Sequence, residues 1–382
     1  MKDGIRVGIV GAGLLGAHHA ETCAANEAAE VVGVADLRAD AAQELAGKVG
    51  AQPYGSAREL FEAERVDFAV IATPDPLHKD PFLAAVAAGV RTILCEKPLA
   101  TTVADAEQML AAADKAGARV FVNYSNRFAW LFMATHRVLQ QGLIGEPVYG
   151  ESRLDDNISV PQRLWQARSR EWAAGSSTAH FLLTHVVDLL HWFLAPARVE
   201  AVYAVKQERV LGFTPDLYDG FLFWDNGIKT RVKAEWVKHI ETLVEFYLCI
   251  GGRAGSVVAH RRPGYGTSEG WRAMLAADRP KDVVASCAQG LTVQGVPVTG
   301  RMIQDPTCDG ERQRGCLELK EQGERVDDDL FLQAIVEDTD SPSNWQGFGP
   351  LPGAEDGLRA VRVIEAFTDS AQKGERVGVP SR

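Results

Sequence analysis

The segment Val7–Gly16, VGIVGAGLLG, constrains the fold of this chain more than any other. Gly11, Gly13 and Gly16 have GxGxxG spacing and follow a β-branched run that predicts a strand. At such a strand-turn-helix junction the first glycine permits a tight turn, the second lets the backbone approach a pyrophosphate, and the third allows close helix packing. The N-terminus of the following helix favours negative charge. The segment therefore predicts a nucleotide-binding βαβ unit, and a glycine turn in another kind of α/β protein is the alternative.

An acidic residue follows at the distance that a dinucleotide site requires. The run VVGVADLR predicts a second strand that ends near Asp36, twenty residues after Gly16. An acid in this place accepts hydrogen bonds from the adenosine ribose and repels a 2′-phosphate, which favours NAD. Arg38 leaves NADP open as the alternative cofactor, because an arginine nearby can accommodate that phosphate.

Composition argues against several classes of protein. A chain of 382 residues is long for one core, so two domains are expected. The net charge of −11 argues against nucleic acid or a membrane as a partner, since binding to such anionic surfaces depends on clustered Lys and Arg. We find no secretory signal and no run of about 18 apolar residues, and the six cysteines form no CxxC pair. We expect a cytoplasmic protein with reduced thiols.

The two expected domains differ in pattern. Over residues 1–124, short β-branched runs alternate with Ala-rich helical stretches, which predicts a doubly wound parallel sheet of the Rossmann type. One of these helices shows its ends, because Thr102 suits an N-cap and Gly117 a C-cap. Over residues 125–382, period-two runs predict a large, mostly antiparallel sheet, so the whole chain is expected to be an α/β protein.

Three further expectations concern the second domain. Asn226-Gly227 lies between two strand-like runs and predicts a hairpin turn. Residues 261–322 are rich in Gly, Pro, Arg and Asp and are expected to form loops, with Cys308 and Cys316 exposed in them. Residues 354–373 have helical spacing and predict a final helix.

The segment ILCEKPLA places chemically useful residues at one edge of the first sheet. Glu96, Lys97 and Pro98 come just after a predicted buried strand, at the edge where ligands of doubly wound sheets bind. A lysine near an apolar core and a charged cofactor is suited to proton transfer. From spacing alone, an exposed surface lysine is the alternative.

Several motifs together identify a family resemblance. The GxGxxG turn, ATPDPLH at Ala72–His78, CEKPLA and GLIGEP at Gly142–Pro147 resemble the Gfo/Idh/MocA family of NAD(P)-dependent sugar and polyol dehydrogenases. The resemblance implies hydride transfer between NAD(P) and a hydroxyl or keto carbon of a sugar, an inositol-like polyol or a glycoside. It also implies a homodimer or homotetramer that assembles through the sheet of the second domain.

The resemblance assigns roles to individual positions. Lys97 would be the catalytic acid/base, aimed by a cis Lys97–Pro98 bond, and His185 would place the reacting hydroxyl. Arg168 matches a family feature near the active site only in part. The residues that the resemblance and the glycine motif assign to cofactor binding are Gly11, Gly13, Gly16, Asp36, Arg38, Thr73, Pro74, Glu96 and Trp165.

The segment SSTAHFLLTHVVDLL departs from the family pattern. His185 and Asp188 match the second half of the family motif D-x-G-x-H-x-x-D, but Phe181 stands where the first acid is expected. His180 lies about 100° away around a regular helix, so it replaces the acid only if the helix begins irregularly. His180 and His185 are five residues apart, which does not suit a metal site, and no metal is expected.

Candidate substrate residues and other functions complete the expectations. The side chains that would suit a polyhydroxylated ring are Arg127, Asp155, Asn157, Trp172, His180 and Thr184. Structural roles in a solvated loop or a buried helix are the alternative for each. Two other functions remain open: a glycoside hydrolase or eliminase that oxidises its substrate transiently, and a non-catalytic NAD(P)-binding sensor, which the missing acid makes conceivable.

Overall fold

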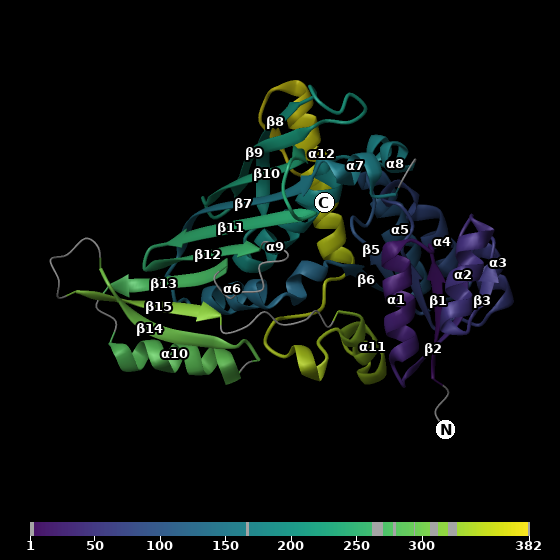
Figure 1. The fold of residues 1–382 in the computed structure, drawn as a ribbon, viewed down its shortest axis with the longest axis horizontal. Coiled ribbons are helices and arrows are strands. Elements are labelled where there is room, and N and C mark those ends of the chain that lie inside the picture. Colours follow the sequence, from purple (N-terminus) through teal and green to yellow (C-terminus); the bar gives the residue numbers. More distant parts are fainter. Residues whose placement is uncertain are drawn as a thin grey trace. The chain divides into compact units, whose positions relative to one another are not determined.

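The protein is described from a computed structural model, over residues 4–165, 168–261, 270–277, 280–293, 295–305, 312–319 and 327–380. The chain forms two compact units (Figure 1). Unit 1 comprises Met1–Tyr124 and Val326–Glu365, and unit 2 comprises Ser125–Arg325 and Ala366–Arg382. No helix among the described residues is long and apolar enough to cross a membrane.

Unit 1 contains a six-stranded parallel sheet in the order β3-β2-β1-β4-β5-β6. This order reverses between β1 and β4, and ligands of doubly wound sheets bind at such a switch point. The expected Rossmann sheet is therefore confirmed. Its strands are β1 Ile5–Val10, β2 Ala29–Ala35, β3 Gln52–Tyr54, β4 Phe68–Ile71, β5 Thr92–Glu96 and β6 Arg119–Asn123.

Helices connect successive strands of this sheet and end where their capping residues predict. In α5, the hydroxyl of Thr102 accepts a hydrogen bond from Asp105 N at 3.1 Å, and Gly117 adopts φ 65° after the last turn. Both caps confirm the expected ends. The helices of this part of the chain are α1 Leu14–Ala25, α2 Ala39–Val49, α3 Ala57–Ala63, α4 Lys79–Ala87, α5 Val103–Ala116 and α11 Asp327–Glu337, with α12 Ala354–Lys373 near the C-terminus.

Unit 2 contains a ten-stranded sheet in the order β14-β15-β13-β12-β11-β7-β10-β9-β8-β16. All pairs are antiparallel except β7 with β10, so the expected mostly antiparallel sheet is confirmed. Its strands are β7 Pro147–Asn157, β8 Val199–Gln207, β9 Leu217–Trp224, β10 Lys229–Lys238, β11 Val244–Gly252, β12 Gly255–Arg261, β13 Trp271–Ala277, β14 Val298–Gln304, β15 Gln313–Leu319 and β16 Val377–Gly378.

Helices pack against one face of this sheet (Figure 1), and the opposite face is called the open face. Buried and partly exposed residues alternate along β9 and β10, and the buried ones face the helices. The hairpin between these strands turns at Gly227, which has φ 85°, as expected. The helices of unit 2 are α6 Trp130–Gln140, α7 Ser159–Arg163, α8 Ser169–Gly175, α9 Thr184–Leu194 and α10 Lys281–Val293.

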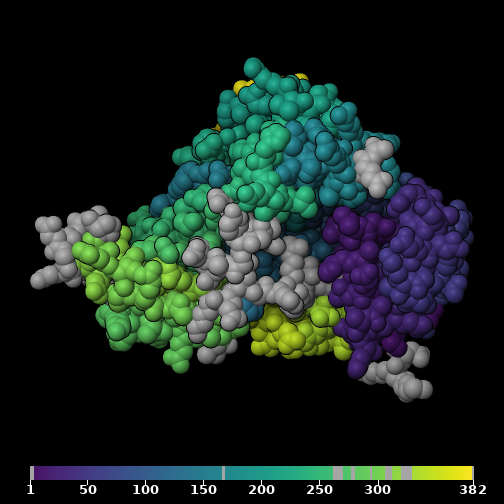
Figure 2. All heavy atoms as spheres, viewed as in Figure 1, coloured from purple at the N-terminus to yellow at the C-terminus, as the bar shows by residue number. Residues whose placement is uncertain are grey.

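The expectation of loops over residues 261–322 was wrong for the described part of that segment. It contains β13, α10, β14 and β15, and α10 packs against β14 and β15 at one end of the sheet (Figure 1). The green spheres of these elements gather at that end of unit 2 in Figure 2. Gly300 and Gly315 hid the strand pattern, yet a Cβ at either position would lie within 3 Å of Val284 on α10. Their lack of side chains allows that helix to pack closely. Cys316 is buried on β15, and Cys308 lies outside the described residues.

Candidate active site

The glycine-rich turn at the end of β1 has the close contacts that its sequence predicts. Gly11 has φ 103°, and a Cβ at Gly16 would lie 1.7 Å from the carbonyl oxygen of Gly11. A Cβ at Gly13 would meet no atom within 4 Å. Gly11 and Gly16 thus shape the turn itself, whereas Gly13 leaves open space beside the first turn of α1. Backbone N–H groups at a helix start suit a phosphate ligand, so this turn fits a dinucleotide.

Asp36, just after β2, is fixed by the backbone around it. Its carboxylate accepts hydrogen bonds from Ala12 N and from Arg38 N, each at 2.8 Å. The Nε of Arg38 lies 3.4 Å from the same carboxylate, so the cation is paired with the acid. The acid is therefore tied directly to the glycine turn.

Exposed apolar side chains lie near these residues in the chain. Leu14 and Leu37 are 63% and 87% exposed, at the start of α1 and next to Asp36. Leu77 is 54% exposed, and its carbonyl oxygen accepts a hydrogen bond from the hydroxyl of Thr73 at 3.0 Å. Pro74 precedes the short 3-10 helix Asp75–Leu77. Apolar groups of this kind suit the planar rings of a nucleotide.

A buried histidine joins the loop after β4 to the loop after β5. The ring nitrogens of His78 lie 2.8 Å from the carbonyl oxygen of Pro98 and 2.9 Å from that of Thr73. A carbonyl oxygen only accepts, so each contact is a hydrogen bond when the facing nitrogen is protonated. His78 thus holds the Lys97–Pro98 segment in register with the loop that contains Thr73.

Glu96 is the centre of a second buried network. Its Oε1 lies 2.8 Å from Nε2 of His19 on α1 and accepts a hydrogen bond from Nδ2 of Asn123 at 2.9 Å. Its Oε2 accepts a hydrogen bond from Lys97 N at 3.2 Å. Burial acts to raise the pKa of Glu96, but the hydrogen bonds and charge of His19, the Asn123 bond and the Lys97 charge together hold it below its ordinary value. The carboxylate is therefore charged and positioned at neutral pH.

Lys97 itself is buried, with 7% of its surface exposed. The Lys97–Pro98 peptide bond is cis, as the resemblance implies. An exposed surface lysine is thus excluded, and the amine belongs to a segment that His78 and Glu96 hold from two sides.

In unit 2, the helix that departs from the family pattern begins with a π turn over Ala179–Leu183. A π turn contains one residue more than an α turn, so residues five apart across it come to the same side. From Ser176 to Leu194 every residue is buried except His180, Phe181 and His185. The irregular start that would bring His180 toward the face of His185 is therefore present.

Asp188 is committed to a structural pair in the interior of unit 2. Its carboxylate accepts two hydrogen bonds from the guanidinium of Arg127, one of them from Nε at 2.8 Å, and both residues are buried.

His136 stacks on Trp192 with ring centroids 4.0 Å apart. Burial, then the charges of Arg137 and Arg127, lower the pKa of His136 to about 3, which keeps it neutral in this cation-rich core.

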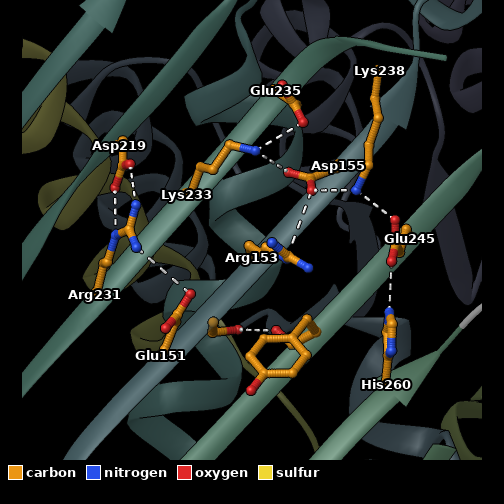
Figure 3. A network of polar contacts seen from close by, with 12 residues as sticks. Glu151, Arg153, Asp155, Asp219, Arg231, Lys233, Glu235, Lys238, Glu245 and His260 are labelled. Atoms are coloured by element: carbon orange, nitrogen blue, oxygen red, sulfur yellow. Dashed lines mark hydrogen bonds and ion pairs between the residues drawn. The ribbon is translucent and has the colours of Figure 1, made fainter. Parts of the chain in front are cut away.

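Two predicted substrate residues on β7 have other partners. Asp155 faces the open side of the sheet, where Lys233 and Lys238 donate to it at 3.2 Å and 3.1 Å (Figure 3). Asn157 donates to the carbonyl oxygen of Ile240 and accepts from Ser159 N, so it fixes the start of α7. Both contacts describe structural roles on this strand.

The remaining predicted residues divide between an aromatic cluster and the core. Trp165 and Trp172 form an edge-to-face pair with centroids 4.1 Å apart, and Trp165 is partly exposed. Thr184, the residue before His185, is fully buried, whereas His180, Phe181 and His185 are partly exposed.

Sequence reasoning missed four buried residues with a positioning role. His19, His78 and Asn123 hold the two loops of unit 1, and Asp156 accepts a hydrogen bond from Trp236 Nε1 at 3.2 Å in unit 2. Period-two alternation from Leu154 would have placed Asp156 on the covered face of β7. The helical spacing of α1 does not indicate the role of His19, because its partner Glu96 lies 77 residues away in the chain.

Comparison with known proteins matches both halves of the chain. Residues 5–124 match the family model described as an oxidoreductase family with an NAD-binding Rossmann fold. Residues 137–379 match the model of the same family's C-terminal alpha/beta domain. The chain belongs to the Gfo/Idh/MocA oxidoreductase family. The resemblance seen in its motifs is confirmed, and the protein is an oxidoreductase with an NAD-binding domain.

Curated relatives of this family member include inositol dehydrogenases. Inositol 2-dehydrogenase of Rubrobacter xylanophilus is 26% identical over 368 residues, 94% of this chain and 92% of the relative. Inositol 2-dehydrogenase 3 of Saccharopolyspora erythraea is 32% identical over 199 residues, 52% of this chain. That second alignment spans 56% of the relative's length.

Solved structures share the fold over the whole chain. Levoglucosan dehydrogenase in complex with NADH and levoglucosan superposes with a TM-score of 0.76 at 20% identity, covering 99% of this chain and 100% of that one. The WlbA dehydrogenase of Bordetella pertussis, in complex with NADH and UDP-GlcNAcA, has a TM-score of 0.75 at 22% identity, covering 100% and 99%. At these identities the likeness establishes the architecture alone.

Proposed function

We propose that this Gfo/Idh/MocA protein is an NAD-dependent dehydrogenase that oxidises a secondary hydroxyl of a sugar, an inositol-like polyol or a glycoside. The observation that supports this most is the buried Glu96-Lys97-Pro98 segment at the end of β5. Two separate buried histidines, His19 and His78, hold it in place. Such fixed placement of an amine is what a proton-transfer residue requires.

The cofactor residues proposed are those of the glycine turn and the loops beside it. Gly11, Gly13 and Gly16 would receive the pyrophosphate at the start of α1, and Asp36 would bind the adenosine ribose. NAD is favoured over NADP because Arg38 is paired with Asp36 and the acid would repel a 2′-phosphate. The bound nicotinamide supplies the hydride acceptor.

Three residues complete the cofactor side in this proposal. Thr73 and Pro74 would line the pyrophosphate and nicotinamide side, and Glu96 would border the nicotinamide. Glu96 is held as a carboxylate by His19 and Asn123, so it offers a fixed negative charge. Trp165, by contrast, is proposed to serve the substrate, because its ring belongs to the aromatic cluster of unit 2.

The proposed chemistry divides between two side chains. The amine of Lys97 takes the proton of the reacting hydroxyl, and His185 orients that hydroxyl by a hydrogen bond. Phe181 offers no carboxylate one turn before His185, so the imidazole acts without the acid that the family motif contains. His180 shares the exposed strip with His185 and would help to bind a neighbouring hydroxyl.

We also propose that the open face of the ten-stranded sheet joins copies of this chain into a homodimer or homotetramer. Tyr203, Val205 and Phe221 are 40%, 46% and 39% exposed on β8 and β9, beside a network of paired charges (Figure 3). Phe221→Glu should lower the mass measured by light scattering, and an unchanged mass would contradict this surface. A cytoplasmic location is proposed because the six cysteines form no CxxC pair.

The test of the function is a panel of inositols, aldoses and glycosides incubated with NAD or NADP in parallel. Formation of reduced cofactor with at least one substrate, faster with NAD, is expected. Product formation without net NADH would instead support transient oxidation in a hydrolase or eliminase. Tight NADH binding without turnover across the panel would support a sensor.

A further inference from the structure

The start of the helix that contains His185 in unit 2 presents a narrow strip of three side chains. His180, Phe181 and His185 are the partly exposed residues of the stretch from Ser176 to Leu194. Two of the three are imidazoles, and the third is a phenyl ring. The strip therefore offers a few hydrogen-bonding groups beside an apolar wall, and none of its members is a carboxylate.

The phenyl ring of Phe181 belongs to a cluster of four aromatic rings. It lies edge-to-face against Trp172, with centroids 4.7 Å apart and planes at 82°, and 6.3 Å from Trp165 at 87°. Trp236 lies 5.2 Å from Trp172 and 6.1 Å from Phe181. Edge-to-face packing at these separations is the favoured arrangement of aromatic pairs, so the rings hold one another in defined orientations.

The cluster has a buried layer and a partly exposed layer. Trp236 is fully buried and Trp172 is 8% exposed, whereas Trp165 and Phe181 are partly exposed. The buried layer is anchored, because Trp236 Nε1 donates to Asp156 at 3.2 Å and Trp236 N donates to Asp216 O at 2.9 Å. Trp165 and Phe181 thus form a preorganised aromatic surface that rests on the buried rings of Trp172 and Trp236.

The polar part of the strip is also fixed. Nδ1 of His180 lies 2.8 Å from the hydroxyl of Ser177, and His180 N donates to the same oxygen at 3.3 Å. Because Ser177 holds the ring orientation of His180, the imidazole and the aromatic surface keep a constant relation. A surface of this kind suits a ligand that has hydroxyl groups on one side and an apolar group on the other.

We propose that Trp165 and Phe181 make this enzyme selective for glycosides with an apolar aglycone over glycosides with a small one. The inference rests on the proposed function, and it specifies the substrate class of that same site. The aglycone packs on Trp165 and Phe181, and the sugar hydroxyls bond to His180 and His185. Burial of a phenyl group against aromatic rings should strengthen binding about tenfold.

The experiment measures binding by calorimetry to the full chain saturated with NADH, so that no oxidation occurs. The probes are the phenyl and the methyl β-D-glycosides of glucose and of galactose. We expect the phenyl member of one pair to bind about tenfold more tightly. In Phe181→Ala this ratio should fall toward one, while Phe181→Leu should retain part of it.

A matched control uses Phe213→Ala, which removes a partly exposed ring that packs on Arg170 outside the cluster. This variant should keep the parental ratio. Any of four results would overturn the proposal. In the parent, these are equal affinities for phenyl and methyl glycosides, or no binding of any probe. In the variants, they are an undiminished phenyl-to-methyl affinity ratio in Phe181→Ala, or a fall of that ratio in Phe213→Ala as large as in Phe181→Ala. NADH is titrated first, because its failure to bind would refute the proposed function, whereas NADH binding without phenyl selectivity would refute this inference alone.

Discussion

Replacement of His19 by alanine tests whether the buried network of unit 1 holds the Glu96-Lys97 segment. His19 Nε2 and Glu96 Oε1 are 2.8 Å apart, and their side chains are 1% and 5% exposed. A hydrogen bond to a charged group contributes about 1.5 to 3 kcal/mol, and the lost imidazole volume adds a cavity. We expect His19→Ala to lower the free energy of unfolding by about 3 kcal/mol.

The effect should depend on pH with a definite sign. In the parent, the pKa of Glu96 is held below its ordinary value of 4.5, so its stabilising contribution is present above that value and is lost as the pH falls below it. Without His19, burial is opposed less and the pKa of Glu96 rises. The difference in stability between parent and variant should therefore be largest near neutral pH and should shrink as the solution is acidified toward the ordinary pKa.

The assay is thermal denaturation followed by circular dichroism, together with NADH titration. A loss of about 3 kcal/mol corresponds to a fall of about 6 to 12 °C in the unfolding midpoint of a domain of this size. His18→Ala is the matched control, because His18 is the preceding residue on α1 and its side chain is exposed. His19→Gln, which keeps a hydrogen-bond donor, should recover part of the loss. Equal midpoints for His19→Ala and His18→Ala at neutral pH would refute the role of this network.

Three further predictions concern the cofactor turn and the core of unit 2. Gly13→Val should fold normally and weaken NADH binding about tenfold or more, because its side chain enters the open space proposed for the pyrophosphate. Gly16→Val should in addition destabilise the turn. Parental NADH affinity in both variants would contradict the proposed cofactor site. Arg127→Met should lower stability by about 3 to 5 kcal/mol by leaving Asp188 buried and uncompensated, and a midpoint within about 2 °C of the parent would refute this. Because the pKa of His136 is lowered from 6.5 to about 3, the folded state should lose stability as the pH falls from 6.5. In denaturant titrations, His136→Phe should reduce this dependence of the unfolding free energy on pH. An unchanged dependence would contradict the role of His136.

The sequence predicted unit 1 well because its signals are local. The glycine spacing and the caps Thr102 and Gly117 each act within one turn or one strand-helix junction, and the structure has them as expected. The partners of Glu96 could not be predicted in this way, since His19 and Asn123 approach it only after the sheet has formed.

Unit 2 was predicted less completely, for physical reasons that differ between its parts. The π turn over Ala179–Leu183 depends on how the helix packs, and helical periodicity alone does not reveal an extra residue. Asp155 and Asp156 are adjacent acids on opposite faces of β7, and only the strand register distinguishes them. The strands near Gly300 and Gly315 lack the apolar alternation that would have indicated them.

Lys97 is proposed to take the hydroxyl proton while NAD is reduced. The most direct test is the initial rate of NADH formation by the parent and by Lys97→Met, with the best substrate of the panel and with NADH affinity measured alongside. We expect a fall in kcat of about 100-fold or more with NADH affinity retained. A rate close to the parental one would contradict it.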